Sequence, residues 1–222
     1  MSDIPPVPPP PPGPPPPPGP GAAYPLTFSV DYPDGGRDRL TSFFRIFVAI
    51  PIVIVLSTLG VSAYGRVSFG IAAGGLLFLG PLLMIVFREK YPRWWFDWNL
   101  QFLRFENRVT AYVLLLRDEY PSTDEEQSVH LDVPYPDVKR QLNRWLPIVK
   151  WLLAIPHFIV LVFLSIAVVV VVIVVWFAIL FTGRCPRGLF DFIVGTLRWS
   201  NRVTAYAFML ATDEYPPFRL GV

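Results

Sequence analysis

The sequence predicts an all-α integral membrane protein with two tandem helical-hairpin repeats, an amphipathic interfacial helix after each hairpin, and a disordered proline-rich N-terminal tail. Hydrophobic residues make up 53% of the chain and charged residues only 16%, whereas about a quarter of an average soluble chain is charged. Two stretches are apolar enough to cross lipid, Ile46–Phe87 and Trp151–Thr182. The hexapeptide NRVTAY occurs twice, at Asn107–Tyr112 and at Asn201–Tyr206.

Matching landmarks flank the two hexapeptides in the same order. Tyr-Pro-Asp occurs at 32 and 135, Ala-Ile-Pro at 49 and 154, and Asp-Glu-Tyr-Pro at 118 and 213. An internal repeat of this kind has to be recognised before individual helices and strands are assigned, because it determines the architecture. The sequence therefore predicts repeat 1 at 24–121, an acidic linker at 122–132 and repeat 2 at 133–222. The offset falls from 105 residues at Ala-Ile-Pro to 94 at NRVTAY, so repeat 2 is shorter in its apolar middle.

Repeat 1 contains two apolar segments of the length that a membrane span requires. They cover 46–64 and 69–87, and each has 19 residues, which is about 28 Å of helix against a hydrocarbon core of about 30 Å. Gly65 and Arg66 supply a break and a charge between them. We therefore expect a hairpin with two spans.

The apolar stretch of repeat 2 has 32 residues, about 48 Å as one helix, which is long for one span and short for two. Basic residues lie on both sides of it, and short basic flanks stay in the cytoplasm. This favours a tight hairpin with spans at 146–163 and 166–182, four spans in total and both termini cytoplasmic. The alternative is three spans with a long tilted third helix.

An amphipathic helix is predicted after each hairpin, at about 93–116 and about 188–210. Each carries tryptophan and a polar stripe at helical spacing, which is typical of helices at the membrane interface. The stripes are either an anion site for lipid headgroups or a set of inter-repeat ion pairs and positive anchors. Their residues are Asp97, Arg104 and Arg108 in repeat 1, and Asp191, Arg198 and Arg202 in repeat 2.

Residues 1–23 form the predicted tail. Proline and glycine dominate positions 4–20, and proline fixes φ and lacks the backbone donor, so an extended polyproline conformation is expected. The tail is either a docking strip for a protein partner or a spacer.

The sequence lacks the local signatures of phosphate loops, dinucleotide folds, nucleophile elbows and zinc proteases. One cysteine and two histidines are few for a metal site. We therefore expect a non-enzymatic multi-pass protein with no cofactor, no metal and no nucleic-acid partner. Its expected role is a scaffold or a partner- or lipid-binding module at the cytoplasmic face of the membrane. A small oligomeric transporter or channel is the alternative.

The second repeat resembles a family of bacterial membrane proteins. The resemblance lies in AIPH at 154–157, WFAILFTGR at 176–184, PRGLFDF at 186–192, LRW at 197–199 and DEYPPF at 213–218. The family is catalogued as domain of unknown function 4389. Repeat 1 looks like a diverged copy, with Ile52 in place of the histidine, Lys90-Tyr91 where Gly-Arg is usual, and Ser122 in place of the second proline. The resemblance implies a bacterial inner-membrane protein and brings no catalytic residues.

Overall fold

The structure, a computed structural model, describes residues 24–33, 35–59, 79–123 and 125–221. The predicted tail and the first half of the predicted span 69–87 lie outside these ranges. The elements in chain order are β1 (Thr27–Val30), α1 (Arg39–Leu59), α2 (Leu79–Arg88), α3 (Arg93–Val113), β2 (Val129–Asp132), α4 (Val138–Gln141), α5 (Leu146–Leu153), α6 (Ile155–Thr182) and α7 (Arg187–Ala207).

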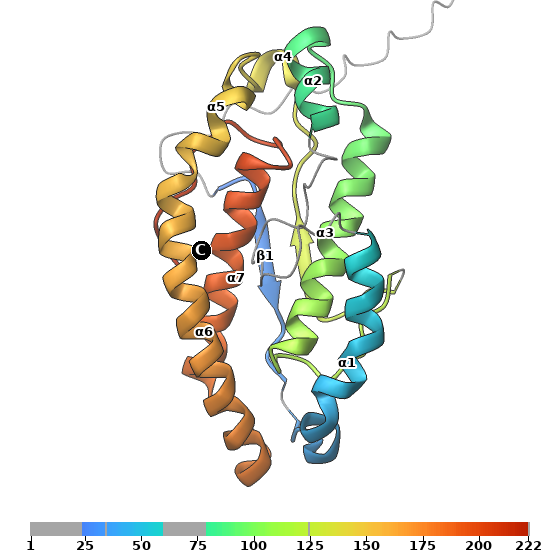
Figure 1. Ribbon diagram of the computed structural model, residues 1–222, viewed down its shortest axis with the longest axis vertical. Coiled ribbons are helices and arrows are strands. Elements are labelled where there is room, and N and C mark those ends of the chain that lie inside the picture. The colour runs from blue at the N-terminus through green and yellow to red at the C-terminus, as the bar shows by residue number, and fades with distance from the viewer. Residues whose placement is uncertain (1–23, 34, 60–78, 124, 222) are drawn as a thin grey trace, which may run out of the picture.

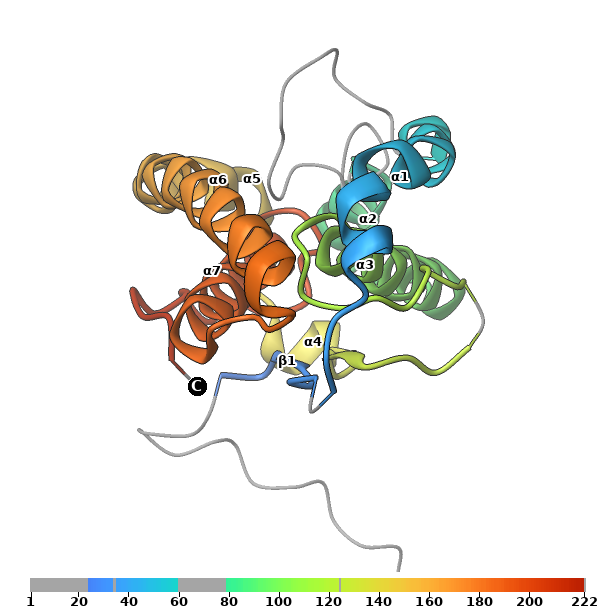
Figure 2. The same cartoon turned by 90° about the horizontal axis from the view of Figure 1, so that it is seen from below.

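The described elements form three layers, seen end-on in Figure 2. Helices α1, α5 and α6 make one outer layer, α3 and α7 the middle layer, and the two strands the other outer layer. Helix α6 packs on α7 and α1 on α3, while β1 packs on α7 and β2 on α3. In Figure 1, α3 runs downwards and α7 upwards, so the two middle helices are antiparallel.

The two strands make the predicted all-α class wrong in one respect. The strands pair antiparallel, with Thr27 opposite Asp132 and Val30 opposite Val129. Alternate residues of each strand are buried against the middle helices, including Phe28 and Leu131. Strand β2 lies inside the predicted linker 122–132. Four residues are too short a run for period-2 alternation to stand out in a sequence.

Helix α6 runs without interruption through 163–166, so the predicted turn there, and with it the four-span arrangement, is wrong for repeat 2. Ser165, the position expected to break the helix, donates its hydroxyl to Val162 O at 2.7 Å within the helix. The long-helix alternative matches this segment. Gly183 ends α6 in the left-handed conformation, with φ of 71°, where glycine carries no Cβ penalty.

Leu146–Thr182 is the stretch of the described chain that is long and apolar enough to cross a membrane. It has 37 residues, and an 18-residue window within it has a mean hydropathy of 3.6. Helix α1, bent by 52°, reaches the same standard only if its two parts are counted as one span. The described structure is therefore mostly helical with one candidate membrane span, and it does not establish a multi-pass arrangement.

The two helices predicted to lie at the membrane interface occupy the middle layer instead. They begin and end at Arg93–Val113 and Arg187–Ala207, close to the predicted 93–116 and 188–210. Most residues of α7 are buried, and even Arg202 is only 2% exposed. Their amphipathic pattern was real, but an apolar face packs equally well on protein, and here α1, α6 and the sheet cover it.

The middle helices have closely similar ends. Each has 21 residues and follows a proline with nearly the same backbone angles, φ −59° and ψ 127° at Pro92 and φ −60° and ψ 128° at Pro186. Each is followed by a leucine at positive φ, Leu115 at 62° and Leu210 at 57°. A left-handed leucine costs about 1–2 kcal/mol, so contacts around each turn must offset that cost.

Candidate functional site

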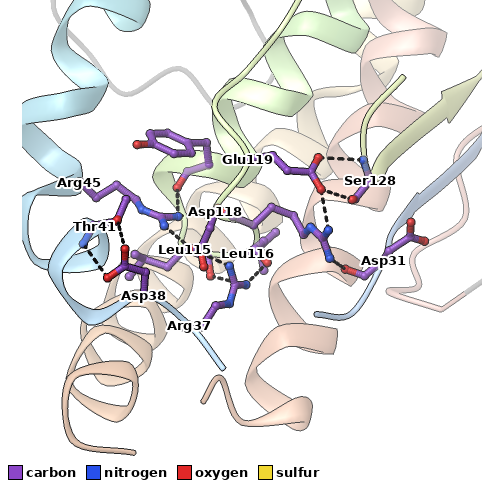
Figure 3. Close-up of polar contacts among 12 residues, drawn as sticks. Asp31, Arg37, Asp38, Thr41, Arg45, Leu115, Leu116, Asp118, Glu119 and Ser128 are labelled. Atoms are coloured by element: carbon purple, nitrogen blue, oxygen red, sulfur yellow. Dashed lines mark hydrogen bonds and ion pairs between the residues drawn. The ribbon is translucent and has the colours of Figure 1, made fainter. Parts of the chain in front are cut away.

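The most highly charged buried group, here called the Asp118 cluster, joins the start of α1 to the end of α3 (Figure 3). The Asp118 carboxylate pairs with the guanidinium groups of Arg37, at 2.9 Å, and Arg45. Both guanidinium groups are 2% exposed. Arg37 also donates to the Leu115 and Leu116 carbonyls. The cluster therefore binds the left-handed turn after α3 from two directions.

Backbone carbonyls and an aromatic ring complete the surroundings of Arg45. Its Nη1 donates to Tyr112 O at 3.0 Å and to Arg117 O at 2.5 Å, and its guanidinium lies 4.5 Å from the centre of the Tyr112 ring. The Tyr112 and Tyr120 rings meet edge to face at 5.7 Å. These contacts join the last residue of NRVTAY to Asp-Glu-Tyr-Pro.

A second group of the same kind, here called the Asp213 cluster, joins α5 to the end of α7. Lys150 is 0% exposed, and its Nζ lies 2.7 Å from Asp213 Oδ1. It also donates to Thr212 O at 2.8 Å and lies 5.1 Å from the Tyr206 ring centre. The Tyr206 and Tyr215 rings meet edge to face at 5.8 Å.

The two clusters use corresponding sequence positions. Lys150 follows Arg45 by 105 residues, the Ala-Ile-Pro offset, and the carboxylate and two tyrosines follow by 94 or 95. This gives NRVTAY and Asp-Glu-Tyr-Pro a physical reason to occur twice. In each place they supply the aromatic face and the carboxylate that a buried cation needs.

The asparagines that begin the two hexapeptides bind each other where α3 meets α7. Asn107 Nδ2 donates to Asn201 Oδ1 at 2.9 Å, and Asn201 Nδ2 donates to Asn107 Oδ1 at 2.7 Å. Each amide also donates to the carbonyl four residues earlier in its own helix, Leu103 O or Leu197 O. Both side chains are buried, so this paired amide contact fixes the register of the two helices.

Contacts near the first turns of the middle helices are exchanged between the two halves of the chain. Tyr32 packs edge to face on Phe190 at 5.1 Å and donates to Cys185 O at 2.5 Å. Tyr135 packs on Phe96 at 5.2 Å and donates to Tyr91 O at 2.5 Å. Each tyrosine also carries an arginine on its ring, Arg187 on Tyr32 and Arg93 on Tyr135. Each half therefore supplies a tyrosine that packs against the first turn of the other half's middle helix.

The sequence-predicted arginines of the polar stripes bind the chain's own carbonyls. Arg104 Nε donates to Leu131 O in β2 at 2.9 Å, and Arg198 Nε to Phe28 O in β1 at 3.0 Å. Arg108 donates to Ser122 O. Arg202 donates to two carbonyls near the C-terminus, those of Arg219 and Gly221.

The two aspartates of the stripes lie apart from these arginine contacts. Asp97 pairs with Arg93, 3.9 Å away in the same exposed first turn. Asp191 is exposed and acts on Arg198 through its charge, partly opposing the burial that lowers the pKa of that guanidinium. The structure does not gather the six predicted residues at one place, and Arg104 forms its ion pair with Asp132.

Around His157, the motifs of the second half converge on an aromatic cluster that sequence reasoning did not assemble. Trp199 Nε1 donates to His157 Nδ1 at 3.1 Å. The imidazole stacks on Phe218 at 4.0 Å and meets Tyr215 at 4.8 Å. Because Nδ1 accepts, the neutral ring carries its proton on Nε2, and that buried atom has no hydrogen-bond partner among the described residues. AIPH, LRW and DEYPPF thus meet in space, a convergence their sequence separation does not reveal.

Burial also shifts the pKa values of Arg37 and Glu106, both outside the candidate span. Burial lowers the pKa of Arg37, and the Asp118 carboxylate opposes that effect. Burial raises the pKa of Glu106 in α3 to about 7. The Glu106 side chain is half-buried, but its Oε2 is enclosed and lacks a hydrogen-bond partner among the described residues.

An open hollow of about 620 Å³ lies beside the segment after β1. Asp31, Tyr32, Arg117 and Arg187 are among its lining residues. Arg117 already binds Asp31 O and Glu119, and Arg187 lies on the Tyr32 ring. Among the described residues, no group of three histidine, cysteine or acidic side chains is placed to hold a metal ion.

Comparison with known proteins gives a family match that covers about a third of the chain and includes the Asp213 cluster. Residues 145–219 match the family model described as Domain of unknown function (DUF4389). The DUF4389 segment begins just before α5 and includes α6, α7 and the His157 aromatic cluster. No curated protein and no solved structure matches the chain.

Proposed function

We propose that this chain is a non-enzymatic membrane protein that serves as a scaffold in the inner membrane. The observation that carries the proposal is the uncovered surface of α6. Its large exposed side chains are all apolar, and they include Ile159, Phe163 and Ile173, each more than half exposed. Exposed apolar patches larger than a few hundred Å² are rare in monomeric soluble proteins. The exposed apolar surface of this helix therefore suits a lipid environment.

We further propose that the chain holds two copies of the DUF4389 architecture, the first diverged. The support is the list of contacts that recur at corresponding positions. It comprises the two cation–carboxylate clusters, the reciprocal asparagine pair, the exchanged tyrosines, and Arg104 and Arg198 on opposite strands. A two-fold exchange of this kind is what two copies of one unit produce when they associate about a common axis.

A scaffold is favoured over an enzyme because the buried charged side chains form contacts within the chain. Arg37, Arg45 and Lys150 are bound to carboxylates and carbonyls of the chain itself. Such groups stabilise each half of the chain internally and offer no exposed nucleophile or base. Anionic lipid headgroups at the flanking arginines, and a protein partner for residues 1–23, are the contacts that we propose for the scaffold.

A small oligomeric transporter or channel is the second candidate. The antiparallel course of α3 and α7 favours it, because inverted repeats are a common plan in secondary transporters (Figure 1). Solute flux into liposomes that contain the purified protein tests this candidate. Flux above that of empty liposomes would replace the scaffold proposal.

Membrane residence is tested by extraction of cell membranes with alkaline carbonate. The wild-type chain is expected to stay in the pellet. Phe163→Asp together with Ile173→Asp places two charges on the exposed face of α6 and is expected to release protein or prevent its insertion. Ser29→Asp together with His130→Asp, on the exposed side of the sheet, is the matched control and should remain in the pellet. Wild-type protein in the soluble fraction would refute the proposal.

The scaffold role is tested by co-purification in a mild detergent. Full-length chain and a variant that lacks residues 1–23 are compared. Loss of the same bound proteins from the shortened chain would support a docking role for the tail. Identical sets would assign the scaffold contacts to the folded part instead.

A further inference from the structure

We infer that α1 and α6 lie in the plane of the membrane, in one leaflet, and do not cross it. The acyl chains of that leaflet then cover the apolar face that the two helices share. The inference rests on the proposed membrane residence and goes beyond it, since a candidate span would ordinarily be read as crossing.

The first argument is length. Helix α6 has 28 residues, about 42 Å at the rise of an α-helix. To keep its whole length within a hydrocarbon core of about 30 Å it would have to tilt by about 45°, whereas spanning helices tilt by about 20° on average and seldom beyond 40°. A helix that lies in the plane has no such limit on its length.

The second argument is the layer on the far side of the molecule. Helices α1 and α6 and the sheet β1–β2 lie on opposite sides of the α3–α7 layer (Figure 2). The sheet runs alongside α3 and α7 rather than beyond their ends (Figure 1). If α6 crossed the bilayer, both strands would therefore lie at membrane depth. A two-stranded sheet has two open edges, and open edges in contact with lipid do not occur in the hydrocarbon region.

The third argument is the polarity of the exposed sheet surface. Ser29, His130 and Asp132 project away from the buried side of the strands. The Asp132 side chain is 77% exposed, and His130 lies 3.2 Å from the exposed carboxylate of Asp31. Charged side chains are strongly disfavoured at the bilayer centre. With α1 and α6 in the plane, this surface faces water.

The helix ends fit the same orientation. Arg144 precedes α5, Arg184 follows α6 and Arg39 begins α1, and all three are exposed. Trp145, 63% exposed, stands at the start of α5. Arginine at both ends of an apolar stretch, with tryptophan at one of them, suits a position at headgroup level. In the plane, both ends of α5–α6 reach the headgroups of the same leaflet.

The test places nitroxide labels along one stripe of α6 in the full-length chain, reconstituted in phosphatidylcholine–phosphatidylglycerol vesicles. Cys185 is first replaced by serine. Ile159→Cys, Ile166→Cys and Ile173→Cys are exposed positions spaced by seven residues, so they share one face about 10 Å apart along the axis. Their depths are measured by collision with oxygen and with a water-soluble nickel complex.

In-plane helices give nearly equal depths at the three positions. Depths that step from one side through the centre to the other would overturn the inference. Labelling of Trp145→Cys and Arg184→Cys by a membrane-impermeant maleimide in intact spheroplasts gives an independent reading. An in-plane chain reacts at both positions or at neither. Reaction at only one places the two ends on opposite sides and overturns the inference, while membrane residence would stand. Protein absent from the membrane fraction fails the proposed function instead.

Discussion

The N-terminal half of the chain (24–121) and the C-terminal half (133–222) both place a carboxylate and tyrosine rings beside buried cationic side chains. The two halves differ in the number of cations and in the hydrogen bonds that each cation makes. Asp118 serves two guanidinium groups, and each of those also binds two backbone carbonyls. Asp213 pairs with one ammonium group, that of Lys150, which also donates to one backbone carbonyl. The Asp213 carboxylate also accepts the Asn143 backbone N–H at 2.5 Å. The comparison teaches that the carboxylate and the tyrosines are the fixed parts, while the cation can vary.

The largest effect is expected from removal of a cluster carboxylate. Asp118→Ala leaves two guanidinium groups buried without a counter-ion and should destabilise the fold by about 4–5 kcal/mol, against about 3 kcal/mol for Asp213→Ala. Unfolding of detergent-solubilised protein by denaturant measures both. Asp132→Ala removes an exposed carboxylate from Arg104 and is the control, expected to cost less than about 1 kcal/mol. Equal values for all three variants would contradict the comparison.

The asparagine pair tests the contact between the halves. Asn107→Leu leaves the Asn201 amide buried without its partner and should cost about 2–3 kcal/mol, and Asn201→Leu should cost the same. The double variant removes both amides together, so its cost should fall short of the sum by at least about 1 kcal/mol. A double-mutant cycle of unfolding free energies gives this coupling. Additive costs would show that the pair does not act as a unit.

Glu106 distinguishes the halves through pH, because the corresponding residue of the second half is Ser200. Its pKa is raised from 4.5 to about 7 by burial, so the folded state holds the proton more tightly than the unfolded state. Stability should therefore fall as pH rises from about 4.5 to about 7 and stay level above that range. Glu106→Gln should remove this slope and add about 2 kcal/mol at pH 8, with allowance for partial exposure. Glu126→Gln, at an exposed position, should keep the wild-type profile.

The smallest effect concerns the His157 aromatic cluster, which among the described residues occurs in the second half alone. His157→Phe keeps a flat ring against Phe218 but removes the acceptor for Trp199, and should cost about 1 kcal/mol. Trp199→Phe should cost more because it also removes ring area, and the double variant should cost less than the sum. A loss well above about 3 kcal/mol from His157→Phe would mean that the imidazole has a further partner.

Several features could be predicted from the sequence because they are local or periodic. The apolar composition, the length of the two amphipathic helices and their boundaries to within a few residues all followed from patterns that one segment carries alone. The resemblance of the second half to DUF4389 was also visible in its motifs and agrees with the match at 145–219. Strand β2 was missed because four alternating residues next to an acidic run give too weak a signal.

The position of each helix depended on contacts that the sequence does not display. Asp97 and Arg104 share a helical stripe, yet Arg104 lies against β2, which was assigned to a linker. Arg45 directly precedes the first apolar stretch and Lys150 belongs to the basic flank of the second, and only folding brings each to a carboxylate more than 60 residues away. The polar stripes were expected to form either an anion site or inter-repeat ion pairs and anchors, whereas their arginines bind the chain's own carbonyls.

By itself the sequence determined that this chain is largely helical, rich in apolar surface and marked twice by NRVTAY and Asp-Glu-Tyr-Pro. Composition and spacing suffice for that, because hydrophobic content and helical periodicity are properties of single segments. Only the tertiary structure decided that α6 continues past Ser165, that α3 and α7 lie inside the fold, and that the repeated motifs neutralise buried cations. Each of these depends on which surfaces meet, and the free energy of a buried charge or an apolar face is set by its neighbours in space.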